Sequence, residues 1–261
     1  MVSLAQSMAQ FWEDAYVKRA EKKKKRFDSF GAEYFGESYY CGERDLPYFE
    51  CHTVALPNFL ALYSEPGLYR AAERTGVCFY QDDFKFDSIG SLADAILHNE
   101  AKLLNEYKKR FEGVDFVITP DYSTYGDMPD FMVAWNIGRS RLVGVWFIME
   151  VGAVVIPNVT YANEGSFSYC LDGIDVGSVV AMSAKGMLAK KENLELLHFA
   201  IRQVVDHLKP KAIVVYSVAD DKTTFTAFEY AIQRGVEIAI PDNTLKRRNR
   251  ILKGDDNDGK K

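Results

Sequence analysis

The chain has 261 residues, 48% of them hydrophobic and 26% charged, which excludes a wholly disordered protein. No apolar run reaches the roughly 18 residues that a membrane-spanning helix needs, and charged residues interrupt the N-terminus too early for a signal peptide. We therefore expect no membrane partner and a cytoplasmic location. The four cysteines then indicate free thiols rather than a disulfide framework.

The net charge of −5 is unevenly distributed, because a basic run lies near each end of an acidic chain. The two runs are 18–26 (KRAEKKKKR) and 244–253 (TLKRRNRILK). Basic arms attract nucleic acid through counterion release, although such runs are also common on solvated helix ends. The candidate nucleic-acid contacts are Lys22, Lys23, Lys24, Lys25, Arg26, Lys246, Arg247, Arg248 and Arg250.

The N-terminal part predicts a helical arm followed by an irregular segment. Residues 3–26 are predicted to be helical, and residues 27–50 are rich in glycine and aromatic residues without a clear period. The apolar positions of the arm are Leu4, Met8, Phe11, Trp12, Ala15 and Val17. We expect residues 1–50 to precede a single α/β domain at 51–253 and a disordered tail at 254–261.

From residue 51 onwards, short apolar runs alternate with helical patterns. The predicted strands are 53–57, 76–80, 115–119, 153–159, 178–183, 212–216 and 236–240. The predicted helices are 91–110, 129–150, 166–171, 193–208, 225–234 and 243–252. Ser91 is a typical N-cap, Gly152 and Gly235 are typical helix ends, and Pro210 stops the helix before it.

The strands are continuous apolar runs, which is typical of parallel strands buried on both faces. Helices between them supply right-handed crossovers. Seven strands in a chain of this length favour a (β/α) barrel or an incomplete barrel. An open doubly wound sheet is the alternative.

Polar side chains follow most of the predicted strands. In both architectures, ligands bind where the carboxyl ends of the strands meet the following loops. The candidate catalytic residues there are Asp83, Asp121 and Asp242, with Asp121 as general base or metal ligand. Converging carboxylates can also hold Mg²⁺, although Asp and Asn are common in loops and helix caps for local reasons. Further candidate ligand-binding residues are Tyr122, Asp127, Asn158 and Lys185.

The sequence lacks the motifs of several well-known functional sites. It has no phosphate-binding glycine loop and no G-x-S-x-G nucleophile elbow. Cys41, Cys51 and His52 do not match a common zinc-ligand spacing. The sequence therefore names no cofactor or metal beyond the Mg²⁺ that the carboxylates could hold.

The central stretch resembles a known family. The runs TPDYSTYGDMPDFMVAWNIGRSRLVGVWF (119–147) and VVIPNVTYANEGSFSYCLDGIDVGSVVAMSAKG (154–186) resemble the domain of unknown function 4417 family of phages, plasmids and bacterial genomes. The match covers about residues 76–243, with Tyr161-Ala162 where the family usually has Trp-Gly. The resemblance implies a phage or mobile-element origin and supplies no activity. It also marks Asp121, Asp127, Asn136 and Arg139 as positions of interest without assigning their roles, and we add Asn136 and Arg139 to the candidate ligand-binding residues.

Three functions are consistent with these patterns. The first is a phage or mobile-element accessory protein that associates with nucleic acid through its basic ends. The second is a barrel-type hydrolase that uses the strand-end carboxylates, with or without Mg²⁺. The third is a non-catalytic binder of a host or phage protein through the N-terminal arm.

Overall fold

The computed structural model describes residues 18–19, 34, 38–48 and 50–253. The predicted tail and nearly all of the predicted N-terminal helix lie outside these ranges. Residues 18–19 belong to a strand, so the helix predicted over 3–26 is wrong at these two positions.

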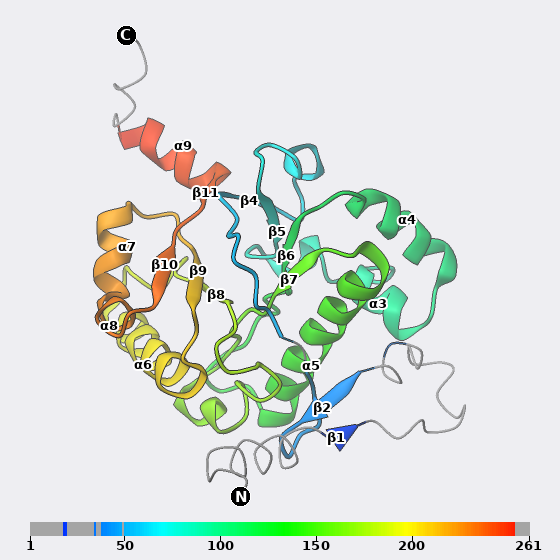
Figure 1. Ribbon diagram of the computed structural model, residues 1–261, viewed down its shortest axis with the longest axis horizontal. Coiled ribbons are helices and arrows are strands. Elements are labelled where there is room, and N and C mark those ends of the chain that lie inside the picture. The colour runs from blue at the N-terminus through cyan, green and yellow to red at the C-terminus, as the bar shows by residue number, and fades with distance from the viewer. Residues whose placement is uncertain (1–17, 20–33, 35–37, 49, 254–261) are drawn as a thin grey trace, which may run out of the picture.

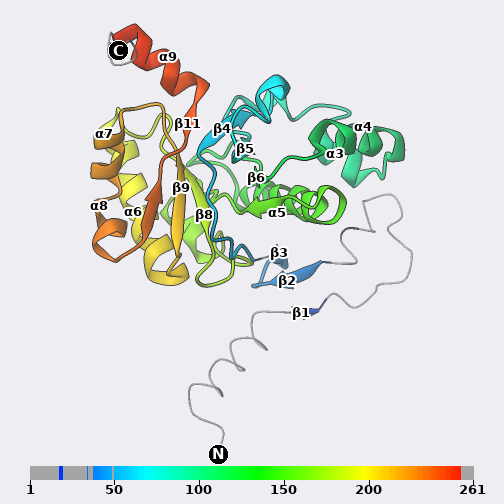
Figure 2. The same ribbon diagram turned by 45° about the horizontal axis from the view of Figure 1, so that its top comes forward.

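The first strands form a small antiparallel sheet in the order β1-β2-β3. They are β1 (Lys18–Arg19), β2 (Tyr39–Cys41) and β3 (Leu46–Tyr48). Gly42 and Asp45, both with positive φ, make the turn between β2 and β3. The hairpin of β2 and β3 lies beside helix α5 (Figure 2). The irregular segment predicted over 27–50 is therefore wrong where this hairpin forms.

A second sheet contains five parallel strands in the order β11-β4-β5-β6-β7. They are β4 (Phe59–Leu62), β5 (Thr75–Cys78), β6 (Phe116–Ile118), β7 (Val154–Ile156) and β11 (Asp242–Asn243). The strand predicted over 53–57 is wrong, because these residues form a loop. Val54 is 97% exposed and Pro57 has no backbone N–H, whereas all four residues of β4 are buried.

A third sheet contains three parallel strands in the order β10-β9-β8. They are β8 (Val180–Ser183), β9 (Ala212–Tyr216) and β10 (Glu237–Ala239). The backbone just after β7 pairs with this sheet, because Ala181 N donates to Pro157 O at 2.8 Å and Val159 N donates to Ala181 O at 2.9 Å. β10 is followed within three residues by β11, which pairs with β4 in the other sheet.

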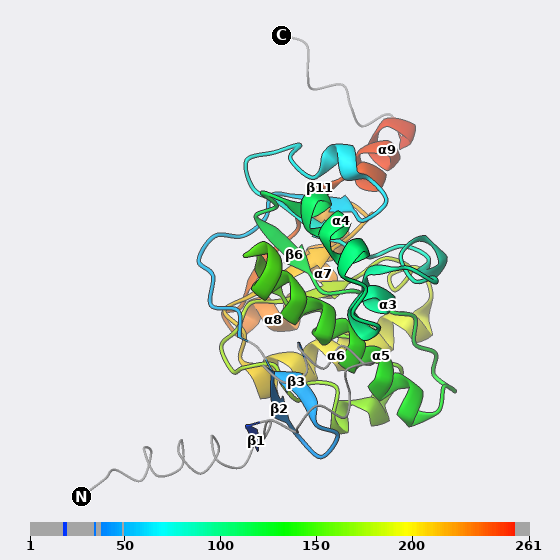
Figure 3. The same ribbon diagram turned by 90° about the vertical axis from the view of Figure 1, so that its right-hand side faces the viewer.

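Helices cover both sides of the strands. They are α3 (Leu92–Leu97), α4 (Ala101–Phe111), α5 (Asp130–Trp146), α6 (Lys191–Leu208), α7 (Asp221–Ala227), α8 (Glu229–Gln233) and α9 (Thr244–Lys253). α6, α7 and α8 lie on one side, and α3, α4 and α5 lie on the other (Figure 1). Figure 3 looks from the second side and shows these three helices in front of the strands. α9 lies at the opposite end of the molecule from the hairpin.

Two predicted helices are each divided in the structure. The helix predicted over 91–110 is α3 and α4, separated at Asn99, which has φ of 52°. Ser91 caps α3 as predicted, since its Oγ accepts from Asp94 N at 3.3 Å. The helix predicted over 225–234 is replaced by α7 and α8, and the helix predicted over 166–171 is a 3-10 turn, Glu164–Ser168. Gly152, with φ of 72°, follows a π-type turn (Phe147–Val151) that extends α5.

The buried side chains form a central cluster between the strands and two larger clusters beneath the helices. The central cluster takes alternate positions from β4, β5, β6, β7, β8 and β9. Its members include Leu60, Leu62, Cys78, Phe116, Ile118, Ile156, Ala181, Val214 and Tyr216. The mixed α/β class and the parallel strands are thus confirmed. Within the described part of the chain, no helix is long and apolar enough to cross a membrane.

Candidate functional site

The carboxyl ends of β5, β6, β7 and β8 bring four polar side chains together. Asn158, just after β7, donates from Nδ2 to Asp121 Oδ1 at 2.8 Å. Tyr80, after β5, donates from its hydroxyl to Asn158 Oδ1 at 2.8 Å. Lys185, after β8, donates from Nζ to the Tyr80 carbonyl oxygen at 3.1 Å. We call Tyr80, Asp121, Asn158 and Lys185 the strand-end cluster.

Asp121 is the carboxyl group at the centre of the strand-end cluster. Burial raises its pKa to about 6, because the charged form loses hydration. That value is a balance, because the charge of Asp83 also favours the protonated form, while hydrogen bonds from Asn158 and Thr160 and the charge of Lys185 favour the ionised form. Asp121 therefore exchanges its proton near neutral pH, which an unperturbed aspartic acid does not do.

Asp83 is held in place beside Asp121 by a single residue. The backbone N–H of Ser123 donates to Asp83 Oδ2 at 3.1 Å, and the Ser123 hydroxyl donates to Asp83 Oδ1 at 3.0 Å. Ser123 is two residues beyond Asp121, so the same loop orients both carboxyl groups. Asp83 and Asp121 thus lie within electrostatic reach of each other, as the sequence predicts for neighbouring parallel strands.

Arg139 and Asn136 lie on α5, and their contacts support the loop that carries Asp121 and Ser123. Arg139 Nη1 donates to both carboxylate oxygens of Asp87, at 2.9 and 2.8 Å. Its guanidinium carbon lies 3.6 Å from the ring centroid of the buried Tyr122, and its Nε donates to Asn136 Oδ1 at 3.0 Å. Asn136 Nδ2 in turn donates to Ser123 O at 2.8 Å. These contacts position Ser123, which holds Asp83.

Two other predicted acidic residues make different contacts. Burial alone would raise the pKa of Asp242, but the hydrogen bond and charge of Arg247 and the charge of Arg250 hold it below its usual range. Arg247 Nε lies 2.6 Å from Asp242 Oδ2, so Asp242 pairs with α9. Asp127 is exposed in the loop between β6 and α5. Their predicted catalytic and ligand-binding roles stay predictions.

The basic residues of α9 differ in their burial and in their ion pairs, and therefore in how freely they could contact nucleic acid. Lys246 is buried, and its Nζ pairs with Asp221. Arg247 and Arg250 pair with Asp242, whereas Arg248 is exposed. The predicted contacts Lys22, Lys23, Lys24, Lys25 and Arg26 lie outside the described residues.

A separate group of side chains lies within metal-ligand distance of one another. Among the described His, Cys, Asp and Glu residues, the group of three is Glu50, His52 and Asp175, with ligand atoms within 4.8 Å of one another. His52 Nε2 lies 3.0 Å from Asp175 Oδ2, so a hydrogen bond already accounts for this contact. The group shares no residue with the strand-end cluster and contains none of the predicted catalytic residues.

Three supporting residues were not predicted from the sequence. The sequence predicts Tyr80 only as the last residue of a strand, whereas in the structure its hydroxyl orients Asn158. Ser123 and Asp87 act through bonds to Asp83 and Arg139, which lie 40 and 52 residues away in the chain. No local pattern indicates such partners, although the position of Tyr80 directly before Gln81-Asp82-Asp83 could have drawn attention to it.

Comparison with known proteins identifies the family. The chain is 31% identical over 166 residues to the Gene 1 protein of Mycobacterium phage L5, covering 63% of this chain and 67% of the phage protein. It is 28% identical over 166 residues to the Gene 1 protein of Mycobacterium phage D29, of which it covers 57%. No solved structure matches the chain. Residues 40–233 match the family described as "Domain of unknown function (DUF4417)", and the chain belongs to that family.

Proposed function

We propose that the strand-end cluster is the acid–base centre of a hydrolase, with Asp121 as the group that transfers the proton. The observation that carries the proposal is the buried setting of Asp121 at the strand ends, where Asn158 donates to its carboxyl group at 2.8 Å and burial raises its pKa to about 6. A base with a pKa just below neutral is mostly ionised at pH 7 and still has strong affinity for a proton. Asp121 would therefore activate a water molecule for attack on a bound substrate.

The neighbours of Asp121 suit this role. Lys185 brings a positive charge close enough to lower the pKa of Asp121, and it could stabilise negative charge that develops on a substrate oxygen. Asp83 keeps the pKa of Asp121 high by like-charge repulsion, and could share a divalent cation with it. Mg²⁺ is the metal of choice for such oxygen ligands.

We further propose that the two parallel sheets, with five and three strands, close into one barrel. The hydrogen bonds of Ala181 to the backbone after β7 support one junction, and the pairing of β11 with β4 supports the other. The central cluster, drawn from alternate residues of six strands, is the expected interior of such a barrel. In a parallel barrel all carboxyl ends of the strands face one opening, which is where (β/α) barrels carry their sites.

The test is a hydrolysis assay with p-nitrophenyl acetate, phosphate and β-glucoside as separate probes. We expect one of them to be hydrolysed with an inflection near pH 6, and Asp121→Asn to abolish the reaction. The matched control is Asp127→Asn, which makes the same change at an exposed carboxyl on the same loop. Parallel assays with Mg²⁺ and with EDTA decide whether the metal takes part. Equal rates for Asp121→Asn and the unaltered chain would refute the role of Asp121.

The relatives support a biological setting. Both are described as Gene 1 proteins of mycobacteriophages. We infer that this chain is an accessory protein of a phage or another mobile element, and that its reaction serves that element.

A second candidate function is association with nucleic acid through α9. The exposed Arg247, Arg248 and Arg250 favour it, since α9 lies at one end of the molecule (Figure 1). Asp242 pairs with two of these arginines and would compete with phosphate groups for them.

The test is fluorescence anisotropy of the full chain with labelled single- and double-stranded DNA at several salt concentrations. Asp242→Asn should strengthen binding and steepen the salt dependence by about one released counterion, because it removes the one negative charge that Arg247 and Arg250 share. Unchanged binding by Asp242→Asn and by Arg248→Glu would exclude α9 as a contact.

A further inference from the structure

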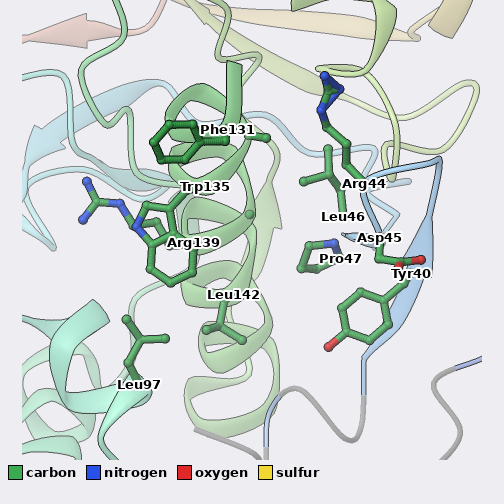
Figure 4. Close-up of a pocket in the computed structure, with 12 residues that line it drawn as sticks. Tyr40, Arg44, Asp45, Leu46, Pro47, Leu97, Phe131, Trp135, Arg139 and Leu142 are labelled. Atoms are coloured by element: carbon green, nitrogen blue, oxygen red, sulfur yellow. The ribbon is translucent and has the colours of Figure 1, made fainter. Parts of the chain in front are cut away.

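A groove lies between α5 and the β2–β3 hairpin, and it shares Arg139 with the contacts that support the loop after β6. Its volume is about 280 Å³. Phe131, Trp135 and Leu142 line it from α5, and Tyr40 and Pro47 line it from the hairpin. Figure 4 shows the aromatic side chains of α5 and the side chains of the hairpin on opposite sides of this space. We call it the α5–hairpin groove.

The α5–hairpin groove leaves large apolar side chains uncovered within the described part of the chain. Phe131 is 73% exposed and Trp135 is 50% exposed, although both lie on a helix most of whose residues from Asn136 to Trp146 are buried. Their positions, four residues apart, put them on one face of α5. An aromatic face of this kind is typical of a surface that receives an apolar segment.

We propose that the occupant of the α5–hairpin groove is the N-terminal segment of the same chain, residues 1–17. The connection supports this, because residues 18–19 form β1, which pairs with β2. Lys18 pairs with Tyr40, and Tyr40 lines the groove. The segment therefore begins at the edge of the groove, so its local concentration there is far above that of any free partner.

The pattern of the segment suits an apolar groove. Leu4, Met8, Phe11, Trp12 and Ala15 follow the i, i+4, i+7, i+8, i+11 spacing of a helix with one apolar face. Such a helix cannot bury this face by itself. Covering Phe131 and Trp135 with it would remove both apolar surfaces from water.

The length of the segment also fits. The positions from Leu4 to Ala15 would span about 17 Å in a helix, and so do the groove positions from Phe131 to Leu142. The segment carries Glu13 and Asp14, and Arg44 lies at the rim of the groove. Arg44 is 3.5 Å from its nearest carboxylate, Asp130, so a second acidic partner is electrostatically favourable.

The test is disulfide trapping in the full chain. The four native cysteines are buried, so an introduced pair would react with each other first. Met8→Cys is combined with Ala134→Cys or, as a second version, with Trp135→Cys, both in the groove. The control combines Met8→Cys with Ile232→Cys, a 44% exposed position of α8, and α8 lies on the other side of the strands from α5 (Figure 1). We expect the groove pairs to cross-link within one chain at least about ten times faster than the control pair.

Two further variants separate docking from chance collision. Phe11→Asp puts a charge on the apolar face and should abolish the rapid cross-link, whereas Gln10→Asp, next to it on the polar face, should preserve it. The rate should not change on tenfold dilution, because the reaction is intramolecular. Cross-linking between two chains would instead make a second copy the occupant and overturn the proposal. Equal rates for groove and control pairs, or equal effects of the two Asp variants, would also overturn it.

Discussion

Asn158 holds Asp121 by a hydrogen bond of 2.8 Å from its Nδ2 to Oδ1 of the carboxyl group. The same amide accepts from Tyr80 and donates to Thr160, so its orientation is fixed from both sides. This contact joins the ends of β6 and β7 and favours the ionised form of Asp121. Burial opposes it, and the balance leaves the pKa of Asp121 near the pH at which proteins operate.

The first prediction is that Asp121→Asn stabilises the protein at neutral pH. The pKa of Asp121 is about 6 in the folded state, above the ~3.9 of an unfolded chain. The folded state therefore binds the proton more tightly, and its stability falls as pH rises from about 4 to 6. Asparagine carries no charge to bury. We expect the free energy of unfolding of Asp121→Asn to exceed that of the unaltered chain by ~1–3 kcal/mol at pH 7 and to equal it near pH 4.

Urea unfolding at both pH values measures this difference. Asp127→Asn is the control, and its exposed site should change stability by less than about 0.5 kcal/mol at either pH. The predicted sign would be contradicted if the stability difference between Asp121→Asn and the unaltered chain were smaller at pH 7 than at pH 4.

The second prediction concerns Asn158→Ala. Without this amide, the charged form of Asp121 loses a hydrogen bond, so we expect its pKa to rise above 6. A pH titration followed by ¹³C NMR of the aspartate side chains gives the pKa directly. Asn163→Ala is the matched control, since Asn163 caps the turn Glu164–Ser168. A pKa of Asp121 that falls in Asn158→Ala would show that Asn158 does not hold the charged form.

The sequence predicted much of the strand-end cluster because two local rules coincide there. Continuous apolar runs marked β5, β6, β8 and β9, and polar residues directly after parallel strands share one edge. Asp83, Asp121, Asn158 and Lys185 could therefore be assigned to that edge without knowing any contact. The family resemblance added Asn136 and Arg139, and the structure gives them a supporting position on α5.

The elements that the sequence predicts wrongly depend on interactions that a short stretch of sequence does not reveal. Two apolar runs compete before and after Pro57, and pairing with β5 and β11 selects the second one. The break at Asn99 needs one residue in the left-handed region, which a helical pattern cannot exclude. Asp242 also follows a strand, but the arginines of α9 turn its carboxyl group toward them.

The third prediction compares the stability contribution of Arg139 with that of an exposed arginine that also contacts an aspartate and a tyrosine ring. Arg139 binds Asp87 with side-chain exposures of 16% and 24%, and it stacks on Tyr122. Arg234 pairs with Asp206 at 58% and 48% and lies over the ring of Tyr230. Removing one member of a largely buried pair leaves an unpaired charge, whereas water replaces an exposed partner.

We therefore expect Arg139→Ala to lower the free energy of unfolding by ~2–4 kcal/mol, and Arg234→Ala by less than about 1 kcal/mol. Arg139→Lys should lie between them, because lysine keeps the charge but loses the Nε bond to Asn136 and the stacking on Tyr122. Chemical denaturation of the three variants is the measurement. Similar losses for the two alanine variants would mean that the bonds of Arg139 add nothing beyond a surface ion pair.

The fourth prediction concerns the close approach of the hairpin at Gly173. Gly173 has φ of +80°, and a Cβ there would lie 2.5 Å from Arg141 Nη1 and 2.5 Å from the backbone oxygen of Pro47. Gly177 has nearly the same φ, +81°, but a Cβ there would meet nothing within 4 Å. Gly177→Ala should therefore cost about 1 kcal/mol, the strain of the left-handed region alone.

Gly173→Ala adds a steric cost, because Pro47 O belongs to β3 and cannot move without the hairpin. We expect a total loss of ~2–4 kcal/mol, measured by urea unfolding of both variants. Gly173→Ala should also increase the hydrogen-exchange rate of the β2–β3 amides, whereas Gly177→Ala should leave that rate unchanged. Equal losses in the two variants would mean that backbone strain, and not contact with the hairpin, explains why glycine is needed at position 173.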